Sequence, residues 1–522
     1  MSAVCRPTQG LATADNGRFL RFWFEPSSGR IGFGHKSSES ARNSHLKWFP
    51  YNKGGKFRKW YGNQDFVVNW ENDGEEIRNF KGSVIRNPKT YFRPSLSWSK
   101  VSTGTIAFRY FPAGFIYDVA GTSVFFDTEK QHIYFSGLLN SKVIDHILRV
   151  ISPTINFEVG QIATLPVIEK SIDEINPYVE KCISIVRSDW DSHETSWDFK
   201  QNELVRLYKE NHGDGVFMDA NRLEDIVTMY KEYWTEQFNQ LHSNEEELNR
   251  QFIEIYGLQD ELTPDVPLDE ITILQQGEIS VEAGQLVWHN DVLAKQLLSY
   301  AIGCMMGRYR LDRPGLHIAY PNPSAADVEA YDFQGEKFEI DDDGIIPLLS
   351  RDCPFDDNAY NRVVKFIRQV FGDSFLNENL NFIESSLGKT IENYFVKDFW
   401  KDHKKMYSNR PIYWLFSSKK GAFQCLAYMH RMNPYTAEQV RSKYLLPYID
   451  FLKNKIAADM DRASALSSME RKNLDKMQIA LDECLEYEER LHDVADQQIH
   501  FDLDDGVIVN YAKFGDVLAK IK

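Results

Sequence analysis

The chain has few cysteines and no long apolar run, and both shortages restrict what it can be. Its 522 residues include only six cysteines, which are scattered and form no CxxC pair or other metal-ligand spacing. This argues against a disulfide scaffold or a zinc module, and it predicts a reduced, cytoplasmic protein. The longest weakly polar stretch, LLSYAIGCMMG at residues 297 to 307, is too short to span a bilayer. We therefore expect no association with a membrane.

Recognisable catalytic motifs are also missing. The strings INPY (175 to 178) and MNPY (432 to 435) are each one proline short of the Asn-Pro-Pro-aromatic turn that grips a flipped base in amino-methyltransferases. SLGKT (386 to 390) resembles the end of a P-loop, but Ile383 stands where the first glycine is needed, so a helix end is predicted instead. None of the 13 histidines belongs to a recognisable constellation. We predict no catalytic, cofactor-binding or metal-binding residue in this chain.

The charge of the chain is distributed unevenly. The formal net charge is -16, which taken alone argues against a nucleic-acid partner. Residues 1 to 110, however, contain 18 Lys and Arg against 8 Asp and Glu, a net charge of +10, so the other 412 residues carry -26. With 43% hydrophobic and 26% charged residues, the chain is long enough for two or three cored domains. One end is basic and the rest is acidic.

The pattern of apolar residues predicts an α+β protein. Short aromatic and β-branched runs separated by Gly, Pro, Asn and Ser indicate strands and loops in the basic end. These runs lie at residues 18 to 25, 65 to 70, 104 to 111, 114 to 126 and 132 to 140. Helical spacing begins at residues 141 to 151, and a mixed α/β domain ending near residue 170 is the simplest interpretation.

The rest of the chain is predicted to be mainly helical. Residues 171 to 260 form an amphipathic helical spacer, and residues 261 to 522 form an acidic, mainly helical domain that begins in a Pro-containing linker. Within this domain, residues 291 to 312 indicate a buried helix. Further helices are expected at 361 to 372 and over the long span from about 436 to 497.

Two basic segments are candidates for contact with DNA. Both place cations beside aromatic rings and small hydroxyl groups, which can neutralise phosphates, stack on bases or read base edges. The first is KGGKFRKW (53 to 60) and the second is RNPKTYFRPSLSWSK (86 to 100). The candidate residues are Lys53, Lys56, Arg58, Lys59, Trp60, Arg86, Lys89, Arg93, Ser95, Trp98 and Lys100. A basic surface that only water covers is the alternative interpretation.

Longer strings resemble one known family. QGLATADNGRFLRFWFE (9 to 25), KWFPYNKGGKFRKWYGNQDFVVNWENDG (47 to 74) and FRPSLSWSKVSTG (92 to 104) are similar to the target-recognition region of PglX. PglX is the adenine-specific DNA methyltransferase of type 1 BREX phage-defence systems. SGLLNSKVIDHILRVISPTINFEVGQIATLPV (136 to 167) continues the resemblance, which runs on to DLDDGVIVNYAKFGDVL (502 to 518). It covers essentially the whole chain.

The resemblance implies sequence-specific recognition of double-stranded DNA, within N6-adenine methylation that marks host DNA. S-adenosylmethionine is the cofactor of full-length members, which carry a methyltransferase domain that would lie just before residue 1. We therefore expect a target-recognition half that works with a methyltransferase half and other BREX components. A stand-alone specificity subunit that acts with a methyltransferase in trans remains open, as does an acidic interaction scaffold of a defence complex. An enzyme with an unrecognised site is a third alternative.

Overall fold

The computed structural model describes residues 1–101, 105–151, 156–213 and 222–521, and it divides into two compact units. Unit 1 comprises Met1–Trp23, Ser28–Phe199 and Tyr230–His289, and unit 2 comprises Phe24–Ser27, Lys200–Met229 and Asn290–Lys522. The domain boundaries expected near residues 170 and 260 do not coincide with this division. Among the described residues, no helix combines the length and the apolar character needed to cross a bilayer.

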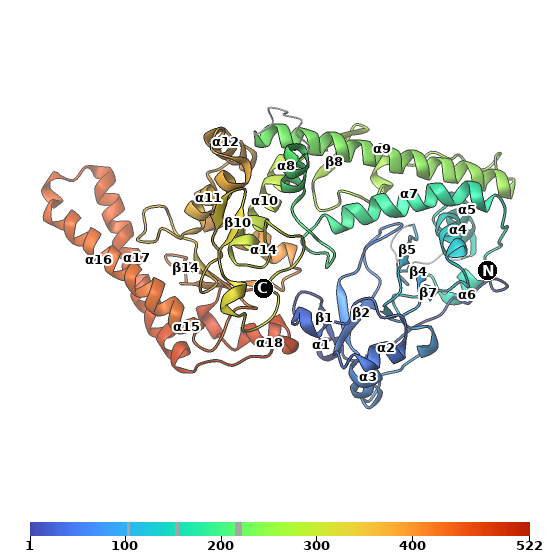
Figure 1. Ribbon diagram of the computed structural model, residues 1–522, viewed down its shortest axis with the longest axis horizontal. Coiled ribbons are helices and arrows are strands. Elements are labelled where there is room, and N and C mark those ends of the chain that lie inside the picture. Colours follow the sequence, from blue (N-terminus) through green and yellow to red (C-terminus); the bar gives the residue numbers. More distant parts are fainter. Residues whose placement is uncertain (102–104, 152–155, 214–221, 522) are drawn as a thin grey trace. The chain divides into compact units, whose positions relative to one another are not determined.

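Unit 1 contains several short strands and longer helices, coloured from blue to green in Figure 1. Its strands are β1 (Leu20–Phe22), β2 (Trp48–Asn52), β3 (Phe66–Asn69), β4 (Ser95–Trp98), β5 (Phe108–Phe111), β6 (Ile116–Tyr117), β7 (Ser123–Val124), β8 (Ile279–Glu282) and β9 (Gln285–Trp288). Its helices are α1 (Asn16–Phe19), α2 (Ser38–Asn43), α3 (Glu71–Arg78), α4 (Glu129–Leu139), α5 (Lys142–Ile151), α6 (Val159–Thr164), α7 (Ile172–Asp191) and most of α9 (Leu223–Tyr256). Short 3-10 turns are η1 (Ser28–Arg30), η2 (Pro88–Thr90) and η3 (Leu268–Glu270).

Two small sheets form the centre of unit 1. One has the order β1-β3-β2-β6, and the other has the order β5-β4-β7. All of their strand pairs are antiparallel except β2 with β6, where Tyr51 lies opposite Ile116. The predicted α+β class is confirmed, because strands and helices are both abundant and the sheets are largely antiparallel.

The first sheet is covered by an aromatic core. Phe49 and Val68 are fully buried on neighbouring strands, and the ring of Phe49 meets that of Phe92 edge to face at 5.9 Å. Trp70, the residue before α3, and Ile77, within α3, belong to the same buried cluster. This burial explains the aromatic richness of the basic segment, since each such ring removes a large apolar area from water.

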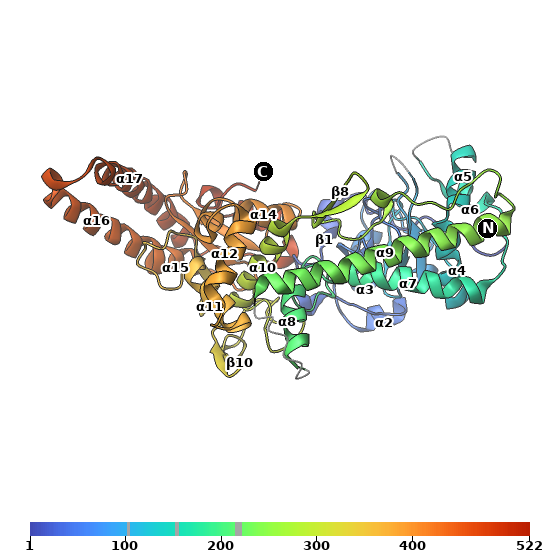
Figure 2. The ribbon, with the colours of Figure 1, turned by 90° about the horizontal axis from the view of Figure 1, so that it is seen from above.

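Helix α4 corrects one prediction, because residues 132 to 140 were expected to form a strand. Thr128 caps the helix by accepting a hydrogen bond from the amide of Gln131. Gly137 lets α4 approach its neighbours: a Cβ there would lie 2.6 Å from Val179 of α7 and 3.4 Å from Phe252 of α9. Helices α4 and α7 lie side by side in both views (Figures 1 and 2). The helix is buried on nearly every side, so it shows no amphipathic period.

Unit 2 is mainly helical, with two small antiparallel sheets. Its main helices are α8 (Glu203–Gly213), α10 (Asn290–Met305), α11 (Ala359–Phe371), α12 (Leu376–Leu387), α13 (Ile391–Lys397), α14 (Phe399–Met406), α15 (Thr436–Gln439), α16 (Leu446–Asp461), α17 (Ser468–Asp496) and α18 (Val507–Ala512), with a π-helical turn at Val440–Leu445. Its strands are β10 (Tyr331–Phe333), β11 (Glu336–Phe338), β12 (Ile345–Pro347), β13 (Tyr413–Ser417) and β14 (Gln424–Tyr428). Its 3-10 turns are η4 (Ala325–Asp327), η6 (Ala463–Ala465), η7 (Leu503–Asp505) and η8 (Gly515–Val517).

Several predictions for unit 2 are confirmed. Helix α10 is buried along most of its length and confirms the predicted helix at 291 to 312 as far as Met305, where it ends. Helix α11 occupies the predicted segment 361 to 372. Helices α16 and α17 pack as a hairpin within the predicted span 436 to 497 (Figures 1 and 2). The P-loop-like string ends a helix, because Gly388 has a φ of +66° and caps α12.

Candidate nucleic-acid interface

The loop after β2 begins with a turn that favours glycine. The buried side chain of Asn52 accepts a hydrogen bond from the amide of Gly54 at 3.1 Å. Gly54 and Gly55 have φ values of +78° and +152°, which residues with a Cβ rarely adopt. Lys53 is half-buried and pairs with Asp118 at 3.2 Å, so its charge is already balanced.

The second half of this loop turns three predicted contact residues into the interior. Arg58 is 6% exposed and pairs with Asp189 at 3.2 Å. Lys59 and Trp60 share Glu245: the Lys59 ammonium lies 2.7 Å from Oε2, and the Trp60 indole donates to Oε1 at 2.7 Å. In this structure these three side chains anchor the loop to helices α7 and α9, and they do not reach solvent.

Three residues of the second basic segment are likewise buried or paired within the protein. Ser95 and Trp98 lie in β4 and are buried, and the Trp98 indole donates to the carbonyl of Phe157 at 3.0 Å. Lys100 is half-buried and pairs with Glu158 at 2.9 Å. Strand β4 therefore belongs to the buried core, and polar groups reach solvent only in the residues before and after it.

Four of the predicted DNA-contact residues are cations that have no carboxylate partner among the described residues. They are Lys56, Arg86, Lys89 and Arg93. No carboxylate in the described ranges lies within 4.0 Å of their charged groups. Three are exposed and Arg86 is half-buried, with its Nη1 buried and unpartnered among the described residues. Arg86, Lys89 and Arg93 lie before β4 in the chain, whereas Lys56 lines a pocket together with Ser99 and Val101, which follow β4.

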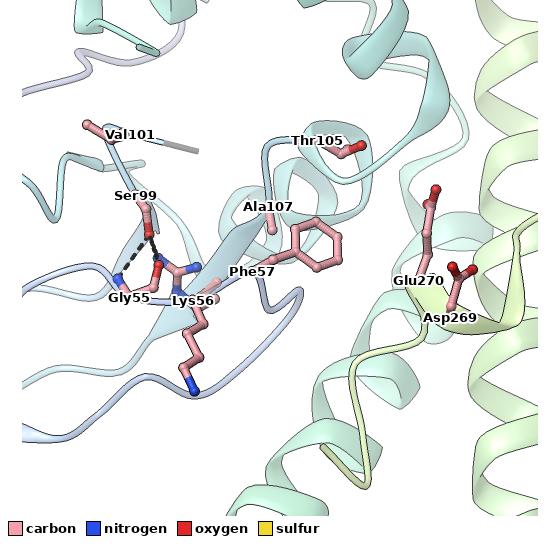
Figure 3. Close-up of a pocket in the computed structure, with 10 residues that line it drawn as sticks. Gly55, Lys56, Phe57, Ser99, Val101, Thr105, Ala107, Asp269 and Glu270 are labelled. Atoms are coloured by element: carbon pink, nitrogen blue, oxygen red, sulfur yellow. Dashed lines mark hydrogen bonds between the residues drawn. The ribbon is translucent and has the colours of Figure 1, made fainter. Parts of the chain in front are cut away.

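A pocket of about 410 Å³ opens beside Lys56. Its lining residues are Gly55, Lys56, Phe57, Ser99, Val101, Thr105, Ala107, Arg109, Asp269 and Glu270. Figure 3 shows Ser99 and Val101 on one side, Asp269 and Glu270 on the other, and Phe57 with Ala107 between them. The volume lies in the range of about 300 to 1,000 Å³ that is typical of small-ligand sites.

Ser99 fastens one side of this pocket. Its hydroxyl donates to the carbonyl of Gly55 at 2.8 Å and accepts from the Gly55 amide at 3.0 Å. It also accepts from Nη2 of Arg109 at 3.1 Å. One small side chain therefore holds the glycine turn and the guanidinium in fixed positions.

Arg109 is an unusual charge for this wall. It is 1% exposed, its two hydrogen-bond acceptors are neutral, and its Nε has no partner among the described residues. Burial, together with the neighbouring charge of Arg58, lowers its pKa to about 10. Burial raises the pKa of nearby Asp65 to about 6, although Arg58, Lys56 and Arg109 oppose this shift. Near neutral pH Arg109 is protonated and Asp65 is mostly ionised, so this one carboxylate offsets part of the charge of Lys56 and Arg109 and the wall keeps a net positive charge.

A buried ionic pair lies behind the same loop. His193 Nε2 is 2.7 Å from Oε1 of Glu278, whose Oε2 accepts from the Gln276 amide at 2.8 Å. Asp189, the partner of Arg58, also accepts from the Leu274 amide at 2.8 Å. These bonds fix the segment that follows η3 against the end of α7.

Sequence reasoning missed Arg109, Asp269 and Glu270. A signal for Arg109 exists, because a charged residue within the apolar strand FRYF must find partners when it is buried. No local signal marks Asp269 and Glu270, which lie in an acidic linker and meet the basic loop only through the fold.

The acidic cluster Asp341–Asp342–Asp343 of unit 2 forms ion pairs with two neighbouring cations. Its carboxylate oxygens lie within 4.8 Å of one another, which is a spacing a metal ion can bridge. Asp341 binds Nη2 of Arg362 at 2.5 Å, and Asp343 pairs with Lys443 at 2.8 Å. These contacts make the cluster a structural ion-pair network.

The described residues do not fit S-adenosylmethionine, the cofactor implied by the resemblance. A cofactor site of this class needs a parallel sheet whose strand leads through a glycine turn into a helix. Among the named strands, only β2 and β6 pair in parallel, over two residue pairs. INPY forms part of helix α7, where Pro177 lies inside the helix, and MNPY precedes α15. We derive no methyl-transfer step from this chain.

Comparison with known proteins points to one class. No protein-family model matches the chain. Two curated relatives are similar to it over nearly its whole length, and both are adenine-specific methyltransferases.

The first relative is the adenine-specific methyltransferase BrxX of Escherichia coli O9:H4 (strain HS), 36% identical over an alignment 543 positions long. The second is the adenine-specific methyltransferase PglX of Lacticaseibacillus casei (strain Zhang), 37% identical over 527. The alignments cover 99% and 97% of this chain but only 43% and 42% of the relatives. The chain therefore spans less than half the length of the proteins it matches.

Proposed function

We propose that this chain is the DNA-recognition part of an adenine-specific DNA methyltransferase of the PglX/BrxX kind. The observation that carries the proposal is the similarity of 36 to 37% over nearly the whole chain to two such methyltransferases. The lack of a fitting cofactor sheet among the described residues favours recognition over catalysis as the role of this part. In this proposal the chain acts in N6-adenine marking of host DNA during BREX defence, in the cytoplasm.

Double-stranded DNA is the proposed partner of unit 1. Lys89 and Arg93 are exposed on the loop before β4, and Lys56 is exposed on the glycine turn. Cations without carboxylate partners release counterions when they meet phosphates, which favours binding at low salt. Arg58, Lys59 and Trp60 are assigned the different role of holding the loop in place.

DNA binding tests the proposal. The chain is titrated into fluorescent duplexes of random sequence at several salt concentrations, and bound duplexes are then selected and sequenced. We expect log K to fall with log salt by about 0.9 per phosphate contact, and one short sequence to be enriched. Absence of binding at low salt overturns the proposal.

A methyltransferase half, encoded in the same or another polypeptide, is the proposed catalytic partner. Labelled S-adenosylmethionine is supplied to the chain alone and to the chain mixed with the remaining part of a relative. Methylation of adenine only in the mixture is the expected result. Methylation by the chain alone contradicts the proposed division of labour.

A protein-interaction scaffold is the second candidate. It is favoured by the charge of -26 outside residues 1 to 110, because an acidic surface repels DNA and attracts basic partners. Charge reversal at Arg93 and Lys89 distinguishes the scaffold function from DNA recognition. Loss of DNA binding supports recognition, whereas unchanged DNA binding with loss of protein capture supports the scaffold.

A further inference from the structure

The pocket beside Ser99 has walls of opposite charge. Lys56 and Arg109 supply cations on one side, and Asp269 and Glu270 supply carboxylates on the other. Lys56 is exposed and has no carboxylate within 4.0 Å among the described residues. A ligand that satisfies both walls must carry an anionic group and hydrogen-bond donors at separate ends.

One buried carboxyl group, Asp65, balances the cationic wall in part, since it faces the charges of Arg58, Lys56 and Arg109. Arg109 is buried, hydrogen-bonds only to a carbonyl and a hydroxyl, and pairs with no carboxylate of the described residues within 4.0 Å. Placing a guanidinium out of water is unfavourable unless an opposite charge compensates it. An anion held by Lys56 at the pocket mouth would also be attracted by the buried charge.

The acidic wall favours N–H donors. Asp269 is exposed, and the side chain of Glu270 is 39% exposed and lies 3.9 Å from Lys59. Ionised carboxylates only accept hydrogen bonds. The amino groups of adenine, cytosine and guanine are donors that suit them.

Between the two walls lies an apolar surface. Phe57 is half-buried and Ala107 lies beside it, while Val101 lines the pocket on the Ser99 side (Figure 3). An aromatic ring beside small apolar groups favours a flat partner, because every nucleobase offers a face on which it can stack. Inorganic phosphate would match the cations but would leave this surface and the carboxylates unused.

We propose that this pocket binds a single nucleotide, with its phosphate at Lys56, its base on Phe57 and its amino group facing Asp269 and Glu270. The volume of about 410 Å³ suits a ligand of this size. The nucleotide has two sources, a residue turned out of bound DNA or a free nucleotide. The first source rests on the proposed DNA-recognition function, and the second does not.

The first arm of the test uses duplexes carrying 2-aminopurine at successive positions of the enriched sequence. Its fluorescence rises several-fold when the base leaves the stack. We expect a rise at one position, and we expect Phe57→Ala and the double variant Asp269→Asn with Glu270→Gln to abolish it. Phe33→Ala, at a ring that is 42% exposed outside the pocket, and Asp265→Asn, at an exposed acid of the same linker, are the matched controls and should keep it.

The second arm uses free AMP, CMP, GMP, TMP and inorganic phosphate, followed by calorimetry and by NMR shifts. Binding of amino-bearing nucleotides that Lys56→Gln weakens at least tenfold supports the free-nucleotide source. Lys56 is exposed, so this variant should fold normally, which thermal melting checks.

The two arms separate failure of the pocket from failure of DNA recognition. If duplex binding is absent, the nucleotide arm still decides the pocket. If duplexes bind but no probe position responds and no nucleotide binds, the pocket proposal is overturned and recognition stands. Equal binding of phosphate and nucleotides, insensitive to Phe57→Ala, also overturns it.

Discussion

The ammonium group of Lys59 lies 2.7 Å from the carboxylate of Glu245, 186 residues further along the chain. Both side chains are nearly inaccessible to solvent. The same carboxylate binds the indole of Trp60, so one glutamate of α9 holds two adjacent residues of the basic loop. The loop owes its shape to a distant helix as much as to its own glycines.

Loss of this carboxylate should destabilise unit 1. Glu245→Gln removes the nearer of two carboxylates and leaves the buried Lys59 with the partly exposed Glu270, 3.9 Å away. Breaking a buried pair of this kind costs about 3 to 5 kcal/mol. Adding Lys59→Met removes the stranded charge while the introduced amide oxygen still accepts from the Trp60 indole, so most of the stability should return. Denaturant unfolding, followed by tryptophan fluorescence, measures both variants.

The exposed pair Lys130–Asp173 is the matched control for that experiment, with side chains 56% and 85% exposed. Its neutralisation should change stability by less than about 1 kcal/mol. If the Glu245→Gln variant is as stable as the unsubstituted chain, the assignment of Glu245 as an anchor is wrong.

The raised pKa of His193 predicts that the folded protein loses stability above neutral pH. Burial lowers its pKa, but the charge and hydrogen bond of Glu278, with the charge of Asp189, outweigh burial and raise it from 6.5 to about 9. The folded state therefore binds the proton more tightly than the unfolded state. The resulting stabilisation, up to about 3 kcal/mol, is fully present below pH 6.5 and is lost as the pH rises through 9.

His193→Gln tests this linkage. The variant should be less stable than the unsubstituted chain at about pH 6, and the two should converge near pH 10, above the raised pKa. The measurement is the denaturant midpoint of unit 1 across this range. Curves that stay parallel would show that His193 does not titrate as its pairing with Glu278 requires.

Surface cations before β4 should set the salt dependence of DNA binding. Lys89→Glu with Arg93→Glu replaces two attractive charges by repulsive ones, and we expect at least a tenfold loss of affinity. The slope of log K against log salt should become shallower by about 0.9 for each phosphate that the variant no longer neutralises. Fluorescence anisotropy measures both quantities.

Lys130→Glu is the control here, because Lys130 already pairs with Asp173 and should contribute little to a DNA surface. The melting temperatures of both proteins should equal that of the unsubstituted chain, since all three cations are exposed. If the double variant binds DNA with unchanged affinity, the DNA-binding surface does not include this loop.

Gly10 should tolerate no side chain. A Cβ at this position would lie 1.8 Å from the carbonyl oxygen of Tyr117, which no rotamer can relieve because the obstacle is backbone. Gly10→Ala should lose at least about 3 kcal/mol, the upper end of ordinary overpacking, or fail to fold. Gly160→Ala, where no atom of the described residues outside the local backbone lies within 4 Å of the added Cβ, should melt like the unsubstituted chain.

Local sequence patterns predicted much of the fold. The helix at 359 to 371 alternates apolar and polar residues with a clear helical period, and Gly388 marks a helix end by its backbone conformation. The segment 132 to 140 was predicted wrongly, because a helix buried on nearly all sides lacks that period and its aromatic residues also suit strands. Length and the Thr128 cap were the better guides.

The candidate interface was less predictable than the fold. Composition found the basic loop, but it could not separate Lys56, which faces solvent, from Lys59 three residues later, which is buried by Glu245. That distinction depends on partners in α7 and α9, which adjacent sequence does not encode. The same holds for Asp269, which lines the pocket with residues more than 150 positions earlier.

The long separation of these partners also orders events during synthesis. Arg58 emerges from the ribosome 131 residues before Asp189, and Lys59 emerges 186 residues before Glu245. Until both acids are made, the loop carries two additional uncompensated cations and lacks its anchors. A nascent chain that ends before α9 therefore presents a more basic and differently shaped loop than the finished protein, and it acquires the mature form only when translation has passed residue 245.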